Sequence, residues 1–371
     1  MPRKILYISY DGMTDPLGQS QVIPYIIGLS KKGYSFHLIS CEKPVNFSSQ
    51  EYYIRNLLEE NNIVWHPLPY TKSPPVLSTL LDIFRIKRKA IRLHRKENFS
   101  LIHCRSYIAA LIGLAMKKKY GTKFIFDMRG LWADERVEGG LWNLKNPLYK
   151  FVYNYFKKKE RQFLSKADYT ISLTHSGKEE MHSWKTISNQ PVPVEVIPCC
   201  VDTSLFSPDN ISNESVERFR SEMKLSKSHF VISYLGATGT WYLLDEMMLF
   251  FKHLLKTKPE AKFLFITPEN PETILNSAKS KSVSAEKIII RKAARNDVPA
   301  LMSLSNVSVF FYRSAYCNIA RSPTKLAEAL ALGIPVICNS NVGDTDSLVL
   351  STQTGIVVNN FSEDSFEKAV G

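Results

Sequence analysis

The chain has 371 residues, of which 44% are hydrophobic and 22% charged, so it can form more than one folded core and is not an intrinsically disordered protein. Its 48 lysines and arginines outnumber its 35 aspartates and glutamates, which gives a formal net charge of +13. This excess favours anionic partners or substrates. The sequence has no zinc-finger spacing, RNP-like run or basic-zipper pattern, so we predict no nucleic-acid partner.

The basic excess is confined to the first half of the chain. Thirty of the basic and 18 of the acidic residues precede position 203, so +12 of the net +13 belongs there. Basic clusters occupy residues 85–96, 117–119 and 157–159. Leu81, Phe84 and Ile91 alternate with cations at helical spacing, which is typical of a basic amphipathic helix on an anionic membrane. A solvated helix face is the alternative. We predict a cytoplasmic protein that is peripherally associated with the inner face of the cell membrane.

Neither export signals nor metal sites are expected. The N-terminal apolar run is too short for a signal peptide, and the longest apolar run elsewhere, residues 107–116, is too short to span a bilayer. The six cysteines show no CxxC or Cys/His ligand spacing. We interpret them as buried thiols in a reducing cytosol, with no metal site and no cofactor.

Strands and helices alternate along the chain, which is the pattern of parallel sheets covered by helices. The expected strands of the first half are residues 5–9, 36–40, 63–66, 101–104, 124–127, 169–173 and 194–197. The main helices between them are residues 20–31, 77–96, 107–120, 147–165 and 176–183. A second set of strands follows at residues 231–235, 262–266, 287–290, 307–311, 336–338 and 354–358. The pattern predicts an α/β protein with two doubly wound, Rossmann-like domains that face a cleft. Their predicted bounds are residues 1–203 and 229–371, with a polar linker over residues 204–228.

Ligands of such sheets bind beyond the carboxyl ends of the strands, so the loops that follow the strands are the candidate ligand sites. The first is residues 10–22, where Gly18 permits close backbone approach and Ser20 can cap a helix. It has the position of a phosphate-binding loop but is not a GxGxxG motif, and a plain turn is the alternative. The corresponding loop of the second domain is residues 236–242. Its glycines and hydroxyls would form a nest of amides for an oxyanion, and Trp241 is either a stacking ring or a packing aromatic.

A third loop, residues 127–136, follows a buried strand and is densely polar. Arg129 could pair with a phosphate, and Asp127 could accept a proton or orient a hydroxyl. His103 and Arg105 end the preceding strand and could face the same site. The alternatives are an ion-pair network and an ordinary core histidine.

Residues 321–336 combine a helix start with a carboxylate one turn later. Thr324 can cap the helix, Lys325 lies beside it, and the free N–H groups of the first turn favour an anion. Glu328 lies on about the same face and could accept hydrogen bonds from sugar hydroxyls. An ordinary capped helix with a solvated glutamate is the alternative.

Together these segments resemble the GT-B glycosyltransferases of glycosyltransferase family 4, and in particular a bacterial subgroup of surface-polysaccharide enzymes. The segments that carry the resemblance are residues 15–21, 126–130, 236–242 and 322–325, Glu328 and residues 333–336. The resemblance implies a nucleotide-sugar donor, UDP- or GDP-linked, in the second domain and a glycan or lipid-linked acceptor in the first. It also implies transfer with retention of anomeric configuration, without a bound metal, and with cations and helix dipoles stabilising the leaving diphosphate.

The resemblance also implies roles for single residues. Glu328 would hold the donor ribose, and Gly18 would approach the donor phosphates. The candidate donor-binding residues are Gly18, Gly236, Thr238, Gly239, Arg313, Ser322, Thr324, Lys325 and Glu328. The candidate acceptor-binding residues are Gln19, His103 and Arg105. The candidate catalytic residues are Asp127, Arg129 and Lys325.

The sequence departs from the family pattern at several points. Ala320 stands where the first Glu of the E-x7-E motif is expected, so sugar recognition must differ. The usual Arg and Lys after the first strand of the donor domain are missing from residues 236–245, so Lys325, with Arg321, Arg313 or Arg129, would neutralise the diphosphate. The frequent histidine of the acceptor domain is replaced by residues 127–129. Family members usually continue with helices that return to the first domain, so truncation of this chain at its C-terminus stays open.

Two other classes of function stay open at this point. A nucleotide-sugar epimerase or hydrolase of GT-B fold would use clustered carboxylates and histidine and would convert the donor alone. A non-catalytic nucleotide-sugar-binding scaffold would turn over nothing, which Ala320 and the missing cation pair would explain.

Overall fold

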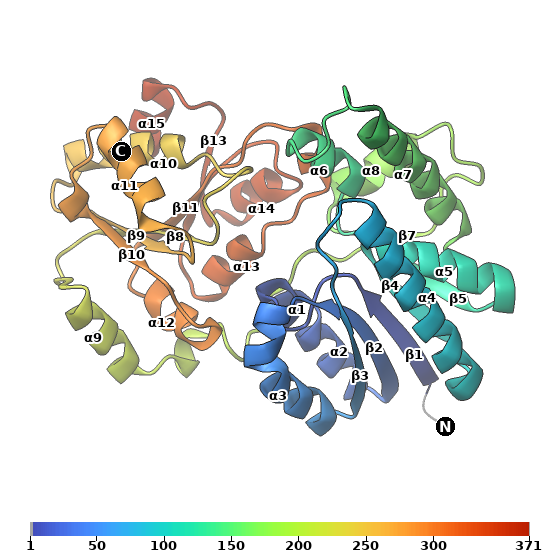
Figure 1. The fold of residues 1–371 in the computed structure, drawn as a ribbon. Helices are drawn as coiled ribbons and strands as arrows, with labels where there is room; N and C mark the ends of the chain where they lie inside the picture. Colours follow the sequence, from blue (N-terminus) through green and yellow to red (C-terminus); the bar gives the residue numbers. More distant parts are fainter. Residues whose placement is uncertain (1–2, 371) are drawn as a thin grey trace. The chain divides into compact units, whose positions relative to one another are not determined.

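The computed structural model describes residues 3–370 and divides into two compact units, Met1–Pro198 and Cys199–Gly371. Each unit has a parallel β-sheet with helices packed against it (Figure 1). The predicted α/β architecture of two doubly wound sheets is therefore confirmed. No helix in the described range combines the length and apolar character needed to cross a membrane.

The first unit has a seven-stranded sheet in the order β3-β2-β1-β4-β5-β6-β7. Its strands are β1 (Arg3–Ser9), β2 (Tyr34–Glu42), β3 (Ile63–Pro69), β4 (Leu101–Arg105), β5 (Lys123–Asp127), β6 (Tyr169–Ser172) and β7 (Val194–Val196). Its helices are α1 (Pro16–Gln21), α2 (Ile23–Ser30), α3 (Pro44–Glu60), α4 (Leu77–Glu97), α5 (Ser106–Tyr120), α6 (Trp132–Glu138), α7 (Pro147–Lys166) and α8 (His175–Ser183). The strand order reverses between β1 and β4, and ligands of such sheets bind beside that point.

The second unit repeats this topology with six strands in the order β10-β9-β8-β11-β12-β13. Its strands are β8 (Val231–Leu235), β9 (Lys262–Ile266), β10 (Ile288–Arg291), β11 (Val307–Phe310), β12 (Val336–Asn339) and β13 (Gly355–Val358). Its α-helices are α9 (Asn213–Glu222), α10 (Leu244–Thr257), α11 (Pro271–Ser280), α12 (Val298–Met302), α13 (Thr324–Ala331), α14 (Thr345–Thr352) and α15 (Glu363–Val370), and short 3-10 turns η1 (Pro208–Asn210), η2 (Ala285–Lys287), η3 (Arg295–Asp297) and η4 (Tyr316–Ala320) join them. Here the order reverses between β8 and β11.

Every predicted strand is present, because each is rich in apolar residues. The central strands β1 and β8 are buried over most of their length, whereas Val64, Tyr169 and Ile356, on strands nearer the sheet edges, are exposed. The helix expected over residues 20–31 is instead two helices, which meet at Val22 just before Pro24. The polar segment 204–228 contains α9. Its Phe206, Phe219 and Leu225 are buried in the core of the second unit.

The cysteines are only partly as expected. Cys41, Cys104, Cys317 and Cys338 are buried, as the sequence indicates, whereas Cys199 is half-buried and Cys200 is exposed. The two exceptions follow β7 in a segment without regular structure, where no sheet encloses them.

Candidate active-site residues of the two units

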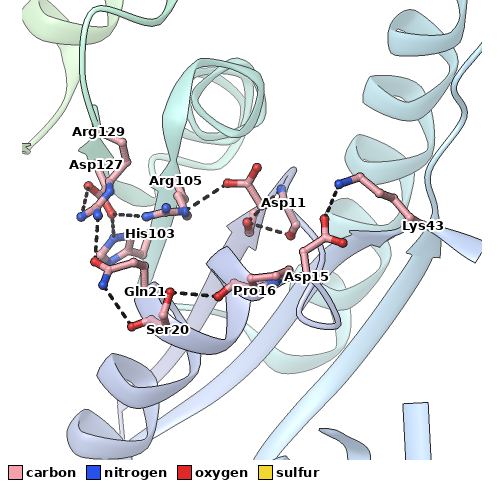
Figure 2. A network of polar contacts seen from close by, with 11 residues as sticks. Asp11, Asp15, Pro16, Ser20, Gln21, Lys43, His103, Arg105, Asp127 and Arg129 are labelled. Carbon is pink, nitrogen blue, oxygen red and sulfur yellow. Dashed lines mark hydrogen bonds and ion pairs between the residues drawn. The ribbon is translucent and has the colours of Figure 1, made fainter. Parts of the chain in front are cut away.

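Four of the predicted site residues lie together in the first unit, at the carboxyl ends of β4 and β5 (Figure 2). They are His103, Arg105, Asp127 and Arg129. The register pairs Arg105 with Asp127 on the neighbouring strands, which is why residues 22 positions apart meet here. Asp11, from the loop after β1, completes the group by accepting a hydrogen bond from Arg105 Nε at 3.3 Å.

The contacts inside this cluster are long. His103 Nε2 lies 3.3 Å from Asp127 Oδ2, Arg129 Nη1 lies 3.8 Å from Oδ1, and Arg105 Nη1 lies 4.0 Å from Oδ2. Elsewhere in the unit, the ion pair between Lys117 and Asp168 closes to 2.7 Å. Within residues 3–370, buried Arg105 Nη1 and Asp127 Oδ1 have no hydrogen-bond partner. Buried polar atoms are seldom left in this state, so the cluster is suited to a polar ligand.

The charge of Asp127 is set by opposing effects. Burial by itself raises the pKa of this carboxyl, but the positive charges of Arg129 and Arg105 and a hydrogen bond with His103 outweigh burial and hold the pKa below its usual value. Asp127 is therefore a carboxylate at neutral pH and can accept a hydrogen bond from a hydroxyl group.

The backbone turns sharply after β5. Arg129 has φ of +58° and Gly130 has φ of +128°, in the region that favours glycine. Strain of this kind in a non-glycine residue is common at functional sites. The turn brings Arg129 Nη2 to 3.3 Å from Gln21 Oε1, and so links β5 to α1.

Hydrogen bonds to the Glu42 carboxylate fix the loop after β1, and the sequence did not indicate this role. The Glu42 side chain is buried and accepts hydrogen bonds from Met13 N at 2.8 Å, Thr14 N at 3.1 Å and Thr14 Oγ1 at 2.6 Å. A Cβ on Gly12 would lie 2.8 Å from Glu42 Oε2. A lone glutamate at the end of an apolar strand is the only signal of this role in the sequence.

Two expectations for this loop need correction or comment. Ser20 does not cap a helix, because it lies inside α1 and its hydroxyl donates to Pro16 O at 2.9 Å. The Gln19 amide donates to Thr14 O at 3.2 Å and to Gln50 Oε1, and so points to α3 rather than to His103 or Arg105.

In the second unit, the residues after β8 and β11 gather around the start of α13. Arg321 stacks on Trp241, with its guanidinium carbon 4.5 Å from a ring centroid, and also approaches Tyr312 at 5.4 Å. Arg313 approaches Trp241 at 5.1 Å. Lys325 Nζ lies 4.2 Å from the ring centroid of Tyr234 and 3.8 Å from that of Tyr242. Basic side chains and aromatic rings therefore alternate beside the predicted phosphate loop.

The remaining donor candidates are placed as follows. Gly236 begins the loop with φ of +115°, and Thr238 is buried. Ser322 Oγ accepts a hydrogen bond from Cys199 N at 3.1 Å. Thr324 is the first residue of α13 rather than its cap, because Pro323 occupies the N-cap position and no side chain caps the helix.

Glu328 is not a solvated carboxylate. It is 3% exposed and is paired with Arg295 Nη1 at 2.5 Å. Arg295 lies 33 residues earlier and has no sequence signal for this role.

Among the residues that the structure describes, no group of three or more His, Cys, Asp or Glu side chains could hold a metal ion.

Solved structures of low sequence identity share this two-unit fold. A glycosyltransferase from Rickettsia africae is 17% identical, with TM-score 0.69, and the match covers 100% of this chain and 91% of that one. Anabaena HepE in complex with UDP and glucose is 13% identical, with TM-score 0.67 and coverage of 99% and 89%. The UDP-GlcNAc 2-epimerase from Neisseria meningitidis bound to UDP-GlcNAc is 15% identical, with TM-score 0.57 and coverage of 99% and 90%. These matches establish the GT-B fold.

Family models then separate the transferases from other proteins of this fold. Residues 25–205 match the model described as Glycosyltransferase Family 4, and residues 215–371 match Glycosyl transferases group 1. The chain therefore belongs to the GT-B glycosyltransferases. No curated protein matches its sequence.

Proposed function

We propose that this glycosyltransferase is a retaining enzyme that transfers a sugar from a UDP- or GDP-sugar to a lipid-linked or surface glycan, as in the surface-polysaccharide subgroup that its sequence resembles. In this proposal the second unit binds the donor and the first unit binds the acceptor. The observation that carries it is the set of three basic side chains, Arg313, Arg321 and Lys325, gathered beside the loop after β8.

The donor assignment follows from charge. A leaving nucleoside diphosphate gains negative charge as the bond to the sugar breaks, and cations held nearby stabilise it. Lys325 and Arg321 take the place of the cation pair that residues 236–245 lack. Glu328, whose orientation is held by Arg295, is the proposed acceptor of hydrogen bonds from the donor ribose.

The acceptor assignment rests on the cluster in the first unit. Asp127 Oδ1 and Arg105 Nη1 offer one hydrogen-bond acceptor and one donor, which together match a hydroxyl group. We assign Asp127 to orient the attacking hydroxyl, and Arg129 to balance its charge.

Helix α4 supports a membrane contact. Its exposed face begins with Leu77, Leu80, Leu81 and Phe84. The same face then continues as a shallow groove lined by Phe84, Lys87, Arg88, Ile91, Arg92, Arg95 and Lys96. Apolar side chains can enter the acyl boundary while lysine and arginine bind anionic headgroups. We therefore propose that the first unit lies on an anionic membrane, where a lipid-linked acceptor is presented.

The test is a thermal-shift panel of UDP, GDP, ADP and their common sugars, followed by a transfer assay. A ligand at 100 times its Kd should stabilise the protein by about 2.7 kcal/mol. The nucleotide that binds is then supplied as its labelled sugar, with and without lipid-linked acceptors, and the anomeric configuration of the product is read by NMR. Turnover of the donor without acceptor would favour an epimerase or hydrolase, and binding without turnover would favour a scaffold.

A further inference from the structure

Lys325 occupies an unusual environment for a lysine. The residue is 7% exposed, and its side chain is enclosed by the rings of Tyr234, on β8, and Tyr242, in the loop that follows. Nζ donates a hydrogen bond to Tyr234 Oη at 3.1 Å, and Tyr234 Oη donates in turn to the carbonyl of Ala237. Lysines are almost never buried to this extent without a paired carboxylate.

That carboxylate is absent from the described part of the chain, where no acidic oxygen lies within 4.0 Å of Lys325 Nζ. Glu328, one helical turn later, is paired with Arg295 instead. Burial lowers the pKa of Lys325 well below its usual value, the carboxylate of Glu328 partly opposes this effect, and the cation Arg321 adds to it.

The Nζ atom of Lys325 faces the loop after β8. A Cβ built on Gly236 would lie 3.3 Å from Lys325 Nζ, so the space that this glycine leaves open borders on the lysine nitrogen. A diphosphate oxygen in that space would be the missing counter-charge. An amine in such a place is favoured as the neutral form when the space is empty and as the ammonium form when an anion fills it.

We propose that Lys325 is uncharged in the empty site and takes up one proton from solvent when the diphosphate of a nucleotide binds beside Gly236. The proton joins the Nζ lone pair, and no bond to the ligand forms or breaks. Binding of the nucleotide is thereby coupled to proton uptake, and affinity falls as pH rises. The inference rests on the proposed donor site in the second unit.

The experiment is isothermal titration calorimetry of the full chain with UDP, and separately with GDP. Titrations run at pH 8 in two phosphate-free buffers of different ionisation enthalpy, because the difference in heat counts the protons exchanged. The terminal phosphate of the free nucleotide has a pKa near 6 and is fully ionised at pH 8, so it takes up none. We expect uptake of about one proton per bound nucleotide.

Two variants show which residue takes up the proton. Lys325→Arg keeps a cation that stays protonated at every accessible pH, so its uptake should vanish. Lys279→Arg, on the exposed face of α11, is the matched control and should keep the uptake of the parent. Parental uptake in Lys325→Arg would overturn the proposal, as would binding of UDP or GDP to the parent without proton uptake.

A second measurement needs no variant, in case the arginine does not fit between the two tyrosines. The Kd of the parent for the same nucleotide is measured from pH 7 to 9. It should rise towards tenfold per pH unit once the pH exceeds the pKa of the empty site. Burial keeps Tyr234 protonated over this range, since it raises the pKa of that hydroxyl. A flat profile would overturn proton coupling and leave the donor site intact, whereas failure of both nucleotides to bind would overturn the donor site itself.

Discussion

Asp127 shows at the scale of one residue how neighbours determine what a carboxylate can do. The positive charges of Arg129 and Arg105 and a hydrogen bond with His103 keep it ionised despite burial, and its Oδ1 is left without a hydrogen-bond partner among residues 3–370. Replacement by asparagine keeps the shape and removes the charge that orients and polarises a hydroxyl. We expect Asp127→Asn to lower kcat about 100-fold, within the range of general acid–base contributions.

The control for this variant is Asp209→Asn, an exposed position in η1. The proposed donor site belongs to the other unit. In Asp127→Asn the Kd for the donor nucleotide should therefore change less than about threefold. Steady-state kinetics and calorimetry together test this, and an unchanged kcat would remove Asp127 from the proposed chemistry.

Glu328 provides the second residue-scale prediction. We expect Glu328→Ala to weaken nucleotide-sugar binding by about 1–3 kcal/mol, because charge-assisted hydrogen bonds to the ribose are lost. Calorimetry measures the change. Glu272→Ala, on the exposed start of α11, is the control. Glu328→Ala also leaves Arg295 without its partner, so Arg295→Met is measured in parallel to show the effect of losing this ion pair. Unaltered nucleotide-sugar affinity in Glu328→Ala would refute the ribose assignment.

At the scale of elements, two glycines of neighbouring helices make opposite predictions. A Cβ on Gly18 in α1 would lie 2.2 Å from Gly12 O, whereas a Cβ on Gly28 in α2 would meet nothing within 4 Å. Gly18→Ala should therefore force α1 away from the loop after β1 and lower both stability and transfer activity. Gly28→Ala should stabilise the protein by up to about 1 kcal/mol, because alanine favours helix.

Urea unfolding and a transfer assay compare the two variants. Equal behaviour of both would contradict the close packing of the loop after β1 against α1.

The exposed face of α4 leads to a prediction about membranes. Replacing Lys87, Arg88, Lys89 and Arg92 with glutamine should release the protein from anionic liposomes, since each cation near such a surface contributes about 1 kcal/mol. Co-sedimentation measures the bound fraction. A variant with glutamine at Lys252, Lys256, Lys258 and Lys279, exposed positions of the second unit, loses the same charge and should stay bound.

The apolar half of the same face is tested separately. Leu80→Ser with Phe84→Ser keeps every cation and should also weaken liposome binding. If the variant with glutamine at Lys87, Arg88, Lys89 and Arg92 binds anionic liposomes as the parent does, α4 is excluded as the membrane contact.

At the scale of the whole molecule, a histidine pair should make stability depend on pH. His37 Nδ1 on β2 lies 3.1 Å from His66 Nε2 on β3. Burial is the main cause that lowers the pKa of both rings, and the pKa of His66 falls to about 4, with nearby cations and its histidine partner adding to the effect. The unfolded chain therefore binds more protons than the folded one between about pH 6.5 and 4, so stability is lost as pH falls through this window.

Urea unfolding at pH 7 and pH 5, at constant ionic strength, measures this loss. We expect the parent to lose about 1 kcal/mol more than His66→Phe, after allowance for solvent screening at a half-buried site. An identical pH dependence of parent and variant would contradict the assignment to His66.

Much of the fold could be predicted because its signals are local. Each parallel strand is an apolar run, and β1 (Arg3–Ser9) and β8 (Val231–Leu235) are evident without any partner. Helix α3 carried no such signal, since its apolar residues are interspersed with exposed Tyr52 and Tyr53. The kink at Val22 depends on how Pro24 begins a new helix, and side-chain spacing alone does not reveal it.

The candidate site was predictable where its residues lie at strand ends, as Arg105 and Asp127 do with His103 two residues before Arg105, because the carboxyl ends of neighbouring parallel strands meet. It was not predictable where a residue acts across a long stretch of sequence. Arg295 reaches Glu328, and Glu42 reaches the loop at Met13 and Thr14, through packing that no local pattern encodes.

The sequence by itself determined the alternation of strands and helices, the two sheets and the loops where ligands of such sheets bind, because hydrophobic periodicity acts over a few residues. Only the tertiary structure decided which charges are paired. It assigned Glu328 to Arg295 and enclosed Lys325 between Tyr234 and Tyr242. The physical reason is that burial and counter-charge set the state of an ionisable group, and both depend on residues that folding brings together from distant parts of the chain.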